Sequence, residues 1–83
     1  MKDKVIGLFF NKKTLEIFLN IEEKYAAKIR NKVGCMYSYT TMRLDQFEKV
    51  GLATSHRDGR KNVYELTEKG KKLKNKLEEI VNE

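Results

Sequence analysis

The chain has no proline, no tryptophan, one cysteine and one histidine among its 83 residues. A single cysteine excludes an intrachain disulfide, and a single histidine leaves no cluster with the spacing of metal ligands. No nucleophile, base or metal constellation of an enzyme is present either. We therefore expect no catalytic residues, no metal, no cofactor and a reducing compartment, the cytoplasm.

Long apolar runs are also missing. The longest, residues 5–10, includes Gly7 and is far shorter than the roughly 20 residues that cross a bilayer. It also lacks the small-residue cleavage site of a signal peptide. We expect a soluble, unprocessed chain with no membrane partner.

Acidic residues are fewer than basic ones: the chain has 12 of the former and 18 of the latter, and so a net charge of +6. Residues 24–50 carry six basic and two acidic side chains (+4), and residues 51–62 carry three and one (+2). A basic excess concentrated in one region is typical of nucleic-acid binders, with a solvated basic surface as the alternative. At this length we expect a single domain over residues 1–83, small enough to benefit from dimerisation.

Residues 51–67 are the most informative stretch. Two strand-like runs flank Asp58-Gly59, which predicts a β-hairpin closed by a type I′ turn with these two residues at its centre. In that register Arg57 faces Arg60, and Ala53 lies opposite Tyr64 on the face of Leu66, which can pack inward. The other face carries Leu52, Thr54, Val63 and Glu65 and is only partly apolar.

The tip of this hairpin is basic. Between His56 and Asn62 it carries three basic side chains and one acid, and like charges facing each other across a turn oppose its closure. Such a tip indicates a partner outside the fold, and a polyanion fits it best. A lone His56 is more typical of polar surface than of a pH sensor.

Upstream of the hairpin, apolar spacing predicts helices. Residues 5–10 form a short helix or a buried strand, of which we take the helix. Asn11 and Thr14 offer N-caps for a helix that begins at Leu15. Two further helices, over 25–33 and 37–50, meet at Gly34 in a helix-turn-helix, with Cys35 a small buried residue at the turn. Their inward positions are Ala26, Ile29 and Val33 in the first and Tyr37, Thr40, Leu44, Phe47 and Val50 in the second.

The last helix is expected over residues 68–82. Thr67 is a good N-cap, Glu68 favours the first turn, and Gly70 weakens it. A narrow apolar seam then recurs at spacings of three and four residues, as in a coiled coil. We expect this seam to form a dimer interface, made by Leu73, Leu77, Ile80 and Val81.

Three motifs follow one another in the second half of the chain. They are Phe47-Glu48-Lys49-Val50-Gly51-Leu52, then Arg57-Asp58-Gly59-Arg60, then Tyr64-Glu65-Leu66-Thr67-Glu68-Lys69-Gly70. In this order they resemble the winged helix-turn-helix regulators of the MarR, ArsR and PadR kind, over about residues 14–83. The resemblance implies a mainly α fold with a small β-hairpin: a helix-turn-helix at 25–50, a wing at 51–67 and a C-terminal dimerisation helix.

The resemblance also implies double-stranded DNA as the partner, bound by a homodimer at a pseudo-palindromic site. The helix over 37–50 would enter the major groove, with Arg43 for guanine and Met42 for a thymine methyl group. The wing would follow the minor groove or the backbone, and the preceding helix would contact phosphates. The expected contacts are Ser38, Tyr39, Thr41, Met42 and Arg43; Arg57, Arg60 and Lys61; and Lys28, Arg30 and Lys32.

The function that follows is sequence-specific transcriptional regulation by occupation of promoter DNA. The chain is much shorter than typical MarR proteins, so no small-molecule effector is expected. The alternative is a protein-interaction module in a larger assembly, because the same fold also serves as a docking unit. Steep loss of affinity with salt would identify the DNA binder.

Overall fold

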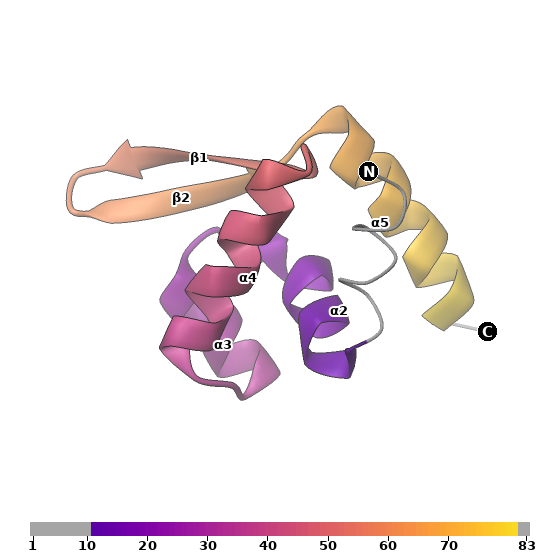
Figure 1. The fold of residues 1–83 in the computed structure, drawn as a ribbon, viewed down its shortest axis with the longest axis horizontal. Coiled ribbons are helices and arrows are strands. Elements are labelled where there is room, and N and C mark those ends of the chain that lie inside the picture. The colour runs from indigo at the N-terminus through magenta and orange to yellow at the C-terminus, as the bar shows by residue number, and fades with distance from the viewer. Residues whose placement is uncertain (1–10, 82–83) are drawn as a thin grey trace.

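The computed structural model describes residues 11–81, and the helix expected over residues 5–10 lies outside them. A small helical body carries a two-stranded hairpin that projects from one side, while α5 lies on the other (Figure 1). The elements in order are α2 (Lys12–Leu19), the 3-10 turn η1 (Ile21–Glu23), α3 (Ala26–Val33), α4 (Tyr37–Lys49), β1 (Ala53–Asp58), β2 (Lys61–Leu66) and α5 (Glu68–Val81).

Helix α2 begins three residues earlier than its predicted start at Leu15. Asn11 is the N-cap, and its side chain accepts hydrogen bonds from the backbone N–H groups of Lys13 (2.8 Å) and Thr14 (3.4 Å). Thr14 is therefore no cap but a buried residue of the first turn, where its hydroxyl lies 3.0 Å from the Tyr39 hydroxyl of α4.

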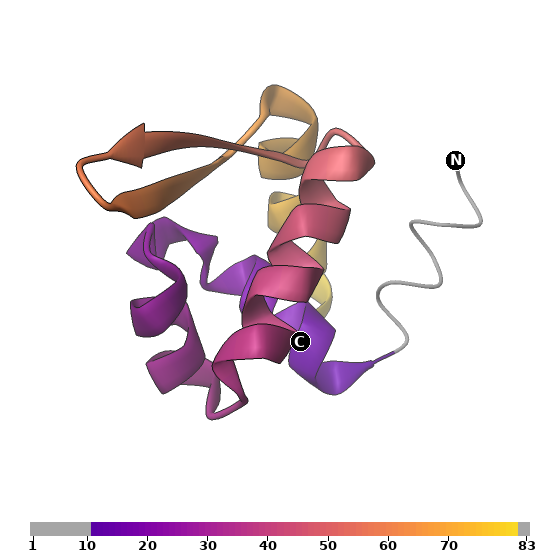
Figure 2. The same ribbon diagram turned by 60° about the vertical axis from the view of Figure 1, so that its left-hand side comes forward.

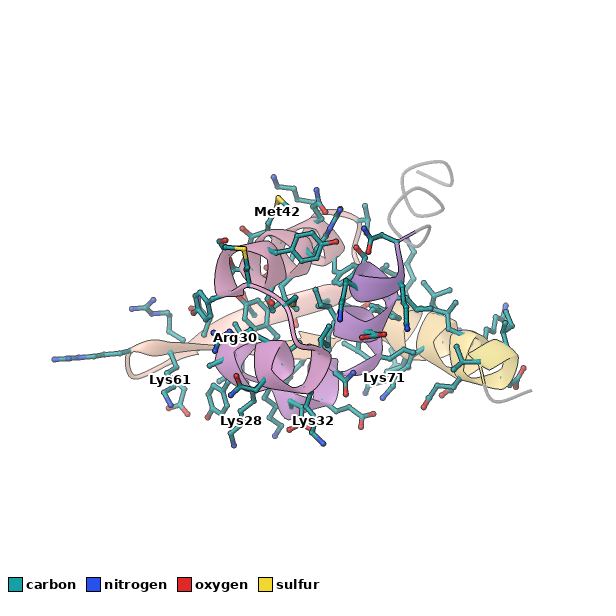
Figure 3. All side chains as sticks on the ribbon, turned by 90° about the horizontal axis from the view of Figure 1, so that it is seen from below. Lys28, Arg30, Lys32, Met42, Lys61 and Lys71 are labelled. Carbon is teal, nitrogen blue, oxygen red and sulfur yellow. The ribbon has the colours of Figure 1, made fainter. Side chains whose placement is uncertain are left out.

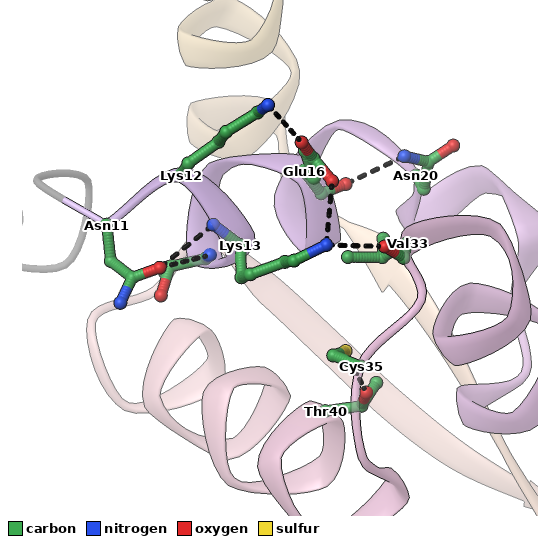
Figure 4. Close-up of polar contacts among 9 residues, drawn as sticks. Asn11, Lys12, Lys13, Glu16, Asn20, Val33, Cys35 and Thr40 are labelled. Carbon is green, nitrogen blue, oxygen red and sulfur yellow. Dashed lines mark hydrogen bonds and ion pairs between the residues drawn. The ribbon is translucent and has the colours of Figure 1, made fainter.

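A tertiary contact joins this first turn to α3. The Lys13 ammonium donates to the Val33 carbonyl at the end of α3 (3.0 Å) and also lies 4.0 Å from Glu16 (Figure 4). Because a lysine favours the carbonyl end of a helix, Lys13 joins the first turn of α2 to the last turn of α3.

Helices α3 and α4 form the predicted helix-turn-helix around Gly34, whose φ of +77° is the left-handed conformation expected of a helix C-cap. Cys35 follows it half-buried, with its sulfur 3.0 Å from the Thr40 hydroxyl (Figure 4). The predicted inward positions of α3 are all buried. In α4, Thr40, Leu44 and Phe47 are buried and Val50 packs against the core.

The core is centred on Phe18 of α2 and Phe47 of α4, whose rings meet edge to face with centroids 5.2 Å apart. Around them lie apolar side chains from each helix of the body and from the base of the hairpin. The fully buried ones include Ile17, Ile21, Ile29, Leu44 and Leu52.

Tyr37 was expected in this core and is instead 54% exposed. It is the first residue of α4 and extends past the end of the buried stripe, on the side of the helix that faces the hairpin. The predicted inward face of α4 therefore begins at Thr40.

The hairpin forms, but its turn lies one residue later in the chain than predicted. Asp58 pairs with Lys61 and Arg57 with Asn62, so the two turn residues are Gly59 and Arg60. Gly59 has a φ of +64°. The φ of Arg60 is not positive, because Lys24 is the one non-glycine residue within 11–81 with a positive φ. A positive φ at the first turn position alone fits a type II′ turn, not the expected type I′.

Each residue still lies on its predicted face of the hairpin. The partner of each residue changes by two positions, and side chains two apart on a strand point to the same face. Ala53 now pairs with Leu66 and Ser55 with Tyr64, and Ala53 and Tyr64 are buried as expected. Val63, on the other face, is also buried. Beyond this base, every residue from 54 to 62 is exposed, and the ribbon extends clear of the body (Figure 2).

Helix α5 is held against the base of the hairpin. The Thr67 hydroxyl accepts from the Gly70 N–H (3.1 Å) and donates to the Gly51 carbonyl (2.7 Å), so the predicted N-cap is confirmed. Gly70 is buried, and a Cβ there would lie 2.0 Å from the Leu52 carbonyl oxygen. Gly70 thus permits close packing of α5 at this point.

The predicted seam of α5 divides into two parts. Leu73 and Leu77 pack partly against the domain's own core, whereas Ile80 and Val81 are 67% and 55% exposed. Beside the seam, Lys74 is buried and its ammonium is paired with Glu22 of η1.

Candidate functional site

A groove of about 470 Å³ runs beneath the hairpin, between β2, the start of α3 and one face of α4. Four basic side chains and one acid line it, so its charge favours an anion. The charged residues are Lys28 of α3, Asp45 of α4, and Arg57, Arg60 and Lys61 of the hairpin; Tyr25, Tyr37, Thr41, Asn62 and Tyr64 also line it.

Tyr64 lies at the base of this groove. Burial raises the pKa of its hydroxyl, and the nearby carboxylates of Asp45 and Glu48 raise it further. A hydrogen bond with Asn62 opposes part of this rise in pKa. The acid that lines the groove, Asp45, belongs to its α4 wall.

The outward face of α4 is accessible. Ser38 is exposed, Met42 is 46% exposed, and Thr41 is half-buried with its hydroxyl donating to the Ser38 carbonyl (3.0 Å). Polar groups and a flexible thioether on one helix face have the chemistry to contact base edges and methyl groups.

Tyr39 and Arg43 belong to a different flank of α4, the one that faces α2. The Arg43 guanidinium stacks over the Tyr39 ring at 5.0 Å and donates to the Gln46 side chain (2.8 Å). Burial would raise the pKa of Tyr39, but hydrogen bonds with Thr14 and Arg43 and the charge of Arg43 outweigh it, so this pKa is lowered. Arg43 is thus already engaged within the domain.

The basic residues of α3 differ in their engagement. Lys32 lies 3.9 Å from Glu23, and Arg30 donates to the neighbouring Asn31 (3.1 Å). Lys28 has neither kind of partner within residues 11–81, and its ammonium lies over the Tyr25 ring.

The predicted contact residues do not form one continuous patch. Seen from below, Met42 lies on the opposite side of the molecule from Lys28, Lys32 and Lys61 (Figure 3). The structure brings Lys28 and Thr41 together with Arg57, Arg60 and Lys61 at the groove, and leaves Tyr39 and Arg43 apart from them.

Three exposed or half-exposed side chains near the site were missed by the sequence prediction: Tyr25, Met36 and Tyr37. Met36 is 72% exposed as the N-cap of α4. The spacing of Tyr25 and Lys28 by three residues is a signal for a helical contact. The approach of the hairpin, which makes Tyr25 and Tyr37 part of the groove, has no such local signal.

Within residues 11–81, no three metal-binding side chains are grouped to hold an ion. In the same range, no helix combines the length and apolarity needed to cross a bilayer.

No family model matches the chain. It is 30% identical over 88 residues to an uncharacterised protein from Archaeoglobus fulgidus, and the match covers 98% of this chain and 93% of that protein. The chain belongs to the family of that protein. A solved structure, AF1382 from the same organism, has a TM-score of 0.83 at 28% identity and covers 93% of this chain and 92% of its own.

Two more solved structures resemble the fold. The homodimeric winged helix-turn-helix DNA-binding domain of Mb0332 from Mycobacterium bovis, a possible ArsR-family transcriptional regulator, has a TM-score of 0.79 at 17% identity, over 98% of this chain and 78% of that one. Sso10a-2, a DNA-binding protein from Sulfolobus solfataricus, has 0.68 at 30%, over 83% and 78%. The domain is therefore a winged helix-turn-helix, mainly α with a small hairpin as its wing.

Proposed function

We propose that this domain is a homodimeric, sequence-specific, double-stranded DNA-binding transcriptional regulator. The observation that carries the proposal is the outer part of the wing, residues 54–62. Each of these residues is exposed, and three of them are basic against the single acid Asp58. No side chain of this ribbon belongs to the hydrophobic core, and its charge suits a phosphate backbone.

Similarity to Mb0332 and Sso10a-2 supports this proposal, because both are described as DNA-binding and Mb0332 as homodimeric. In the proposed complex, α4 enters the major groove and the wing lies on the adjacent minor groove or backbone. The base-contacting set is Ser38, Tyr39, Thr41, Met42 and Arg43; the wing contacts are Arg57, Arg60 and Lys61; the phosphate contacts of α3 are Lys28, Arg30 and Lys32.

Arg43 reaches guanine in this proposal only after its guanidinium leaves Tyr39 and Gln46. Tyr39 likewise reaches a base only after its hydroxyl leaves Thr14. Ser38, Thr41 and Met42 need no such rearrangement, because the outward face of α4 already presents them. Base readout by Arg43 therefore costs part of its present hydrogen bonding.

The second copy is proposed to join through α5, where Ile80 and Val81 are exposed next to the partly packed Leu73 and Leu77. A two-fold dimer of this kind reads two half-sites about one helical turn apart, which is a pseudo-palindrome.

Selection of bound duplexes from a random DNA pool tests the proposal, and the selected site is then titrated at several salt concentrations. We expect a symmetric motif and a steep, log-linear loss of affinity with salt. Binding that is equally tight at low and physiological salt, or a pool that stays random, would contradict the proposal.

Arg60→Ala tests the wing itself. Loss of one phosphate contact should weaken binding to every sequence and reduce the salt slope by about 1. The matched control is Lys12→Ala, which removes the same charge from α2, where the side chain is 86% exposed and paired with Glu16 at 3.8 Å. Equal effects of the two substitutions would mean that only net charge matters.

A further inference from the structure

The Tyr25 ring holds two ammonium groups from two different elements. Lys28 of α3 lies 5.6 Å from the ring centroid, and Lys61 of the wing lies 5.2 Å from it. Both distances are within the range of a cation–π contact. The aromatic residue just before α3 therefore links the first helix of the helix-turn-helix to the wing.

Neither ammonium has a carboxylate partner among residues 11–81. Two like charges gathered at one ring repel each other, and a half-buried tyrosine returns only a modest attraction. The arrangement is thus a local excess of positive charge that an added anion would neutralise.

A backbone hydrogen bond joins the wing to the segment that precedes α3. The Tyr64 N–H of β2 donates to the Lys24 carbonyl (2.8 Å), and Lys24 holds a left-handed conformation with a φ of +74°. This tie sets β2 beside residues 24 and 25, so the wing meets Tyr25 before any ligand arrives.

We propose that Tyr25 is a positioning residue for a backbone-phosphate site made by Lys28 and Lys61. The inference rests on the proposed DNA-binding function and adds to it that α3 and the wing grip the phosphates of one DNA strand as a unit. Lys28 and Lys61 supply the charge, and the Tyr25 ring fixes where that charge sits.

The geometry is tested first, without DNA. An aromatic ring shifts the NMR resonances of protons that lie over its face. The side-chain methylene protons next to the Lys28 and Lys61 ammonium groups should be shifted upfield in the parent and in Tyr25→Phe, and should lose this shift in Tyr25→Leu. Unshifted resonances in the parent would overturn the proposed arrangement, whether or not the domain binds DNA.

Binding to the selected duplex tests the role. Lys28→Ala and Lys61→Ala should each lower the salt slope by about 1. Tyr25→Leu should weaken binding roughly three- to tenfold with the slope kept, since both charges remain but are no longer positioned. Tyr25→Phe should bind like the parent, because its ring still holds both lysines.

A double-mutant cycle separates positioning from general stability. Tyr25→Leu and Lys61→Ala should be non-additive, whereas Tyr25→Leu and Lys32→Ala should add, because Lys32 is paired with Glu23 rather than with the ring. Additive effects in both cycles would overturn the inference.

Two further outcomes are distinct. Parent protein that fails to bind any duplex would reject the proposed function, while the NMR result would still report on the ring. Inorganic phosphate alone, if it bound at micromolar concentration and shifted the same lysine resonances, would assign the site to a free anion and overturn the backbone-phosphate role.

Discussion

The Leu52 carbonyl lies so close to α5 at Gly70 that no side chain fits at this position. In an exposed helix, replacement of glycine by alanine is favourable by about 1 kcal/mol. Here the new Cβ would lie 2.0 Å from a backbone oxygen, so the backbone of α5 or of Leu52 would have to shift.

We expect Gly70→Ala to lower the free energy of unfolding by about 1–3 kcal/mol, because overpacking outweighs helix propensity. Urea unfolding measures it. Asn75→Ala, at an exposed site of the same helix, is the control and should be neutral or slightly stabilising. A stabilised Gly70→Ala would show that α5 is not held as closely as described.

The proposed contact of Met42 with a thymine methyl group can also be tested. If its thioether meets a thymine methyl group, replacing that thymine by uracil in the selected site removes the contact without changing the base pairing. The parent should lose about 1 kcal/mol of binding at one position, whereas Met42→Ala should bind both duplexes equally. An equal loss in parent and variant would assign the methyl contact to another residue.

Single residues show what local sequence determines. Gly34 and Thr67 were predicted as caps, because a cap depends on neighbours within three or four positions. The start of α2 was placed three residues late although its cap, Asn11, was one of the two local candidates, so the error was to let the helix begin after Thr14. The exposure of Tyr37 depends on what packs beside α4, which spacing does not encode.

At the scale of elements, α4 is joined to α2 by a chain of contacts from Thr14 to Tyr39, Arg43 and Gln46. These contacts make a test of base readout by Arg43 possible. Gln46→Ala removes one bond that restrains the guanidinium, while the Tyr39 stack remains.

We expect Arg43→Ala to relax preference at one base pair by about 1–3 kcal/mol, measured by competition between single-base variants of the selected site. Gln46→Ala should bind a guanine-containing site at least as tightly as the parent, since less must be broken to free Arg43. Unchanged preference in Arg43→Ala would leave Arg43 with only its contacts to Tyr39 and Gln46 on α4.

The wing was predicted as a hairpin with the correct inward face, and only its turn was misplaced. Both registers use Gly59, so the local turn signal could not separate them. The predicted register sets Arg57 against Arg60, whereas the observed one sets Asp58 against Lys61. Opposite charges across a strand pair are favourable and like charges are not, so this cross-strand pairing is the signal that would have found the register.

At the scale of the whole molecule, the large apolar side chains left exposed within residues 11–81 gather in two places. Met36, Tyr37 and Met42 lie at the N-cap and in the first half of α4, and Ile80 and Val81 lie at the end of α5. For so small a domain these two places are the natural candidates for contact with partners. The apolar spacing predicted the group on α5 as a seam. It did not predict that Leu73 and Leu77 of this seam pack onto the body, because that contact is between elements far apart in the chain.

We expect Ile80→Asp to give monomers in sedimentation and to leave the domain folded, because that side chain is 67% exposed. Leu77→Asp should also break the dimer but lower stability as well, since Leu77 packs on its own core. Asn75→Asp adds the same charge to an exposed site of the helix and should stay dimeric. An unchanged dimer in Ile80→Asp would move the interface elsewhere.

The outer ribbon, finally, lies outside the hydrophobic core and contacts the body through Lys61, whose ammonium lies over the Tyr25 ring. Since no residue from 54 to 62 belongs to the hydrophobic core, exchanging that loop for one of another composition that keeps Lys61 leaves the core intact. The tip of the wing can therefore be exchanged to change the target, and such a loop graft should leave the melting temperature of the domain unchanged.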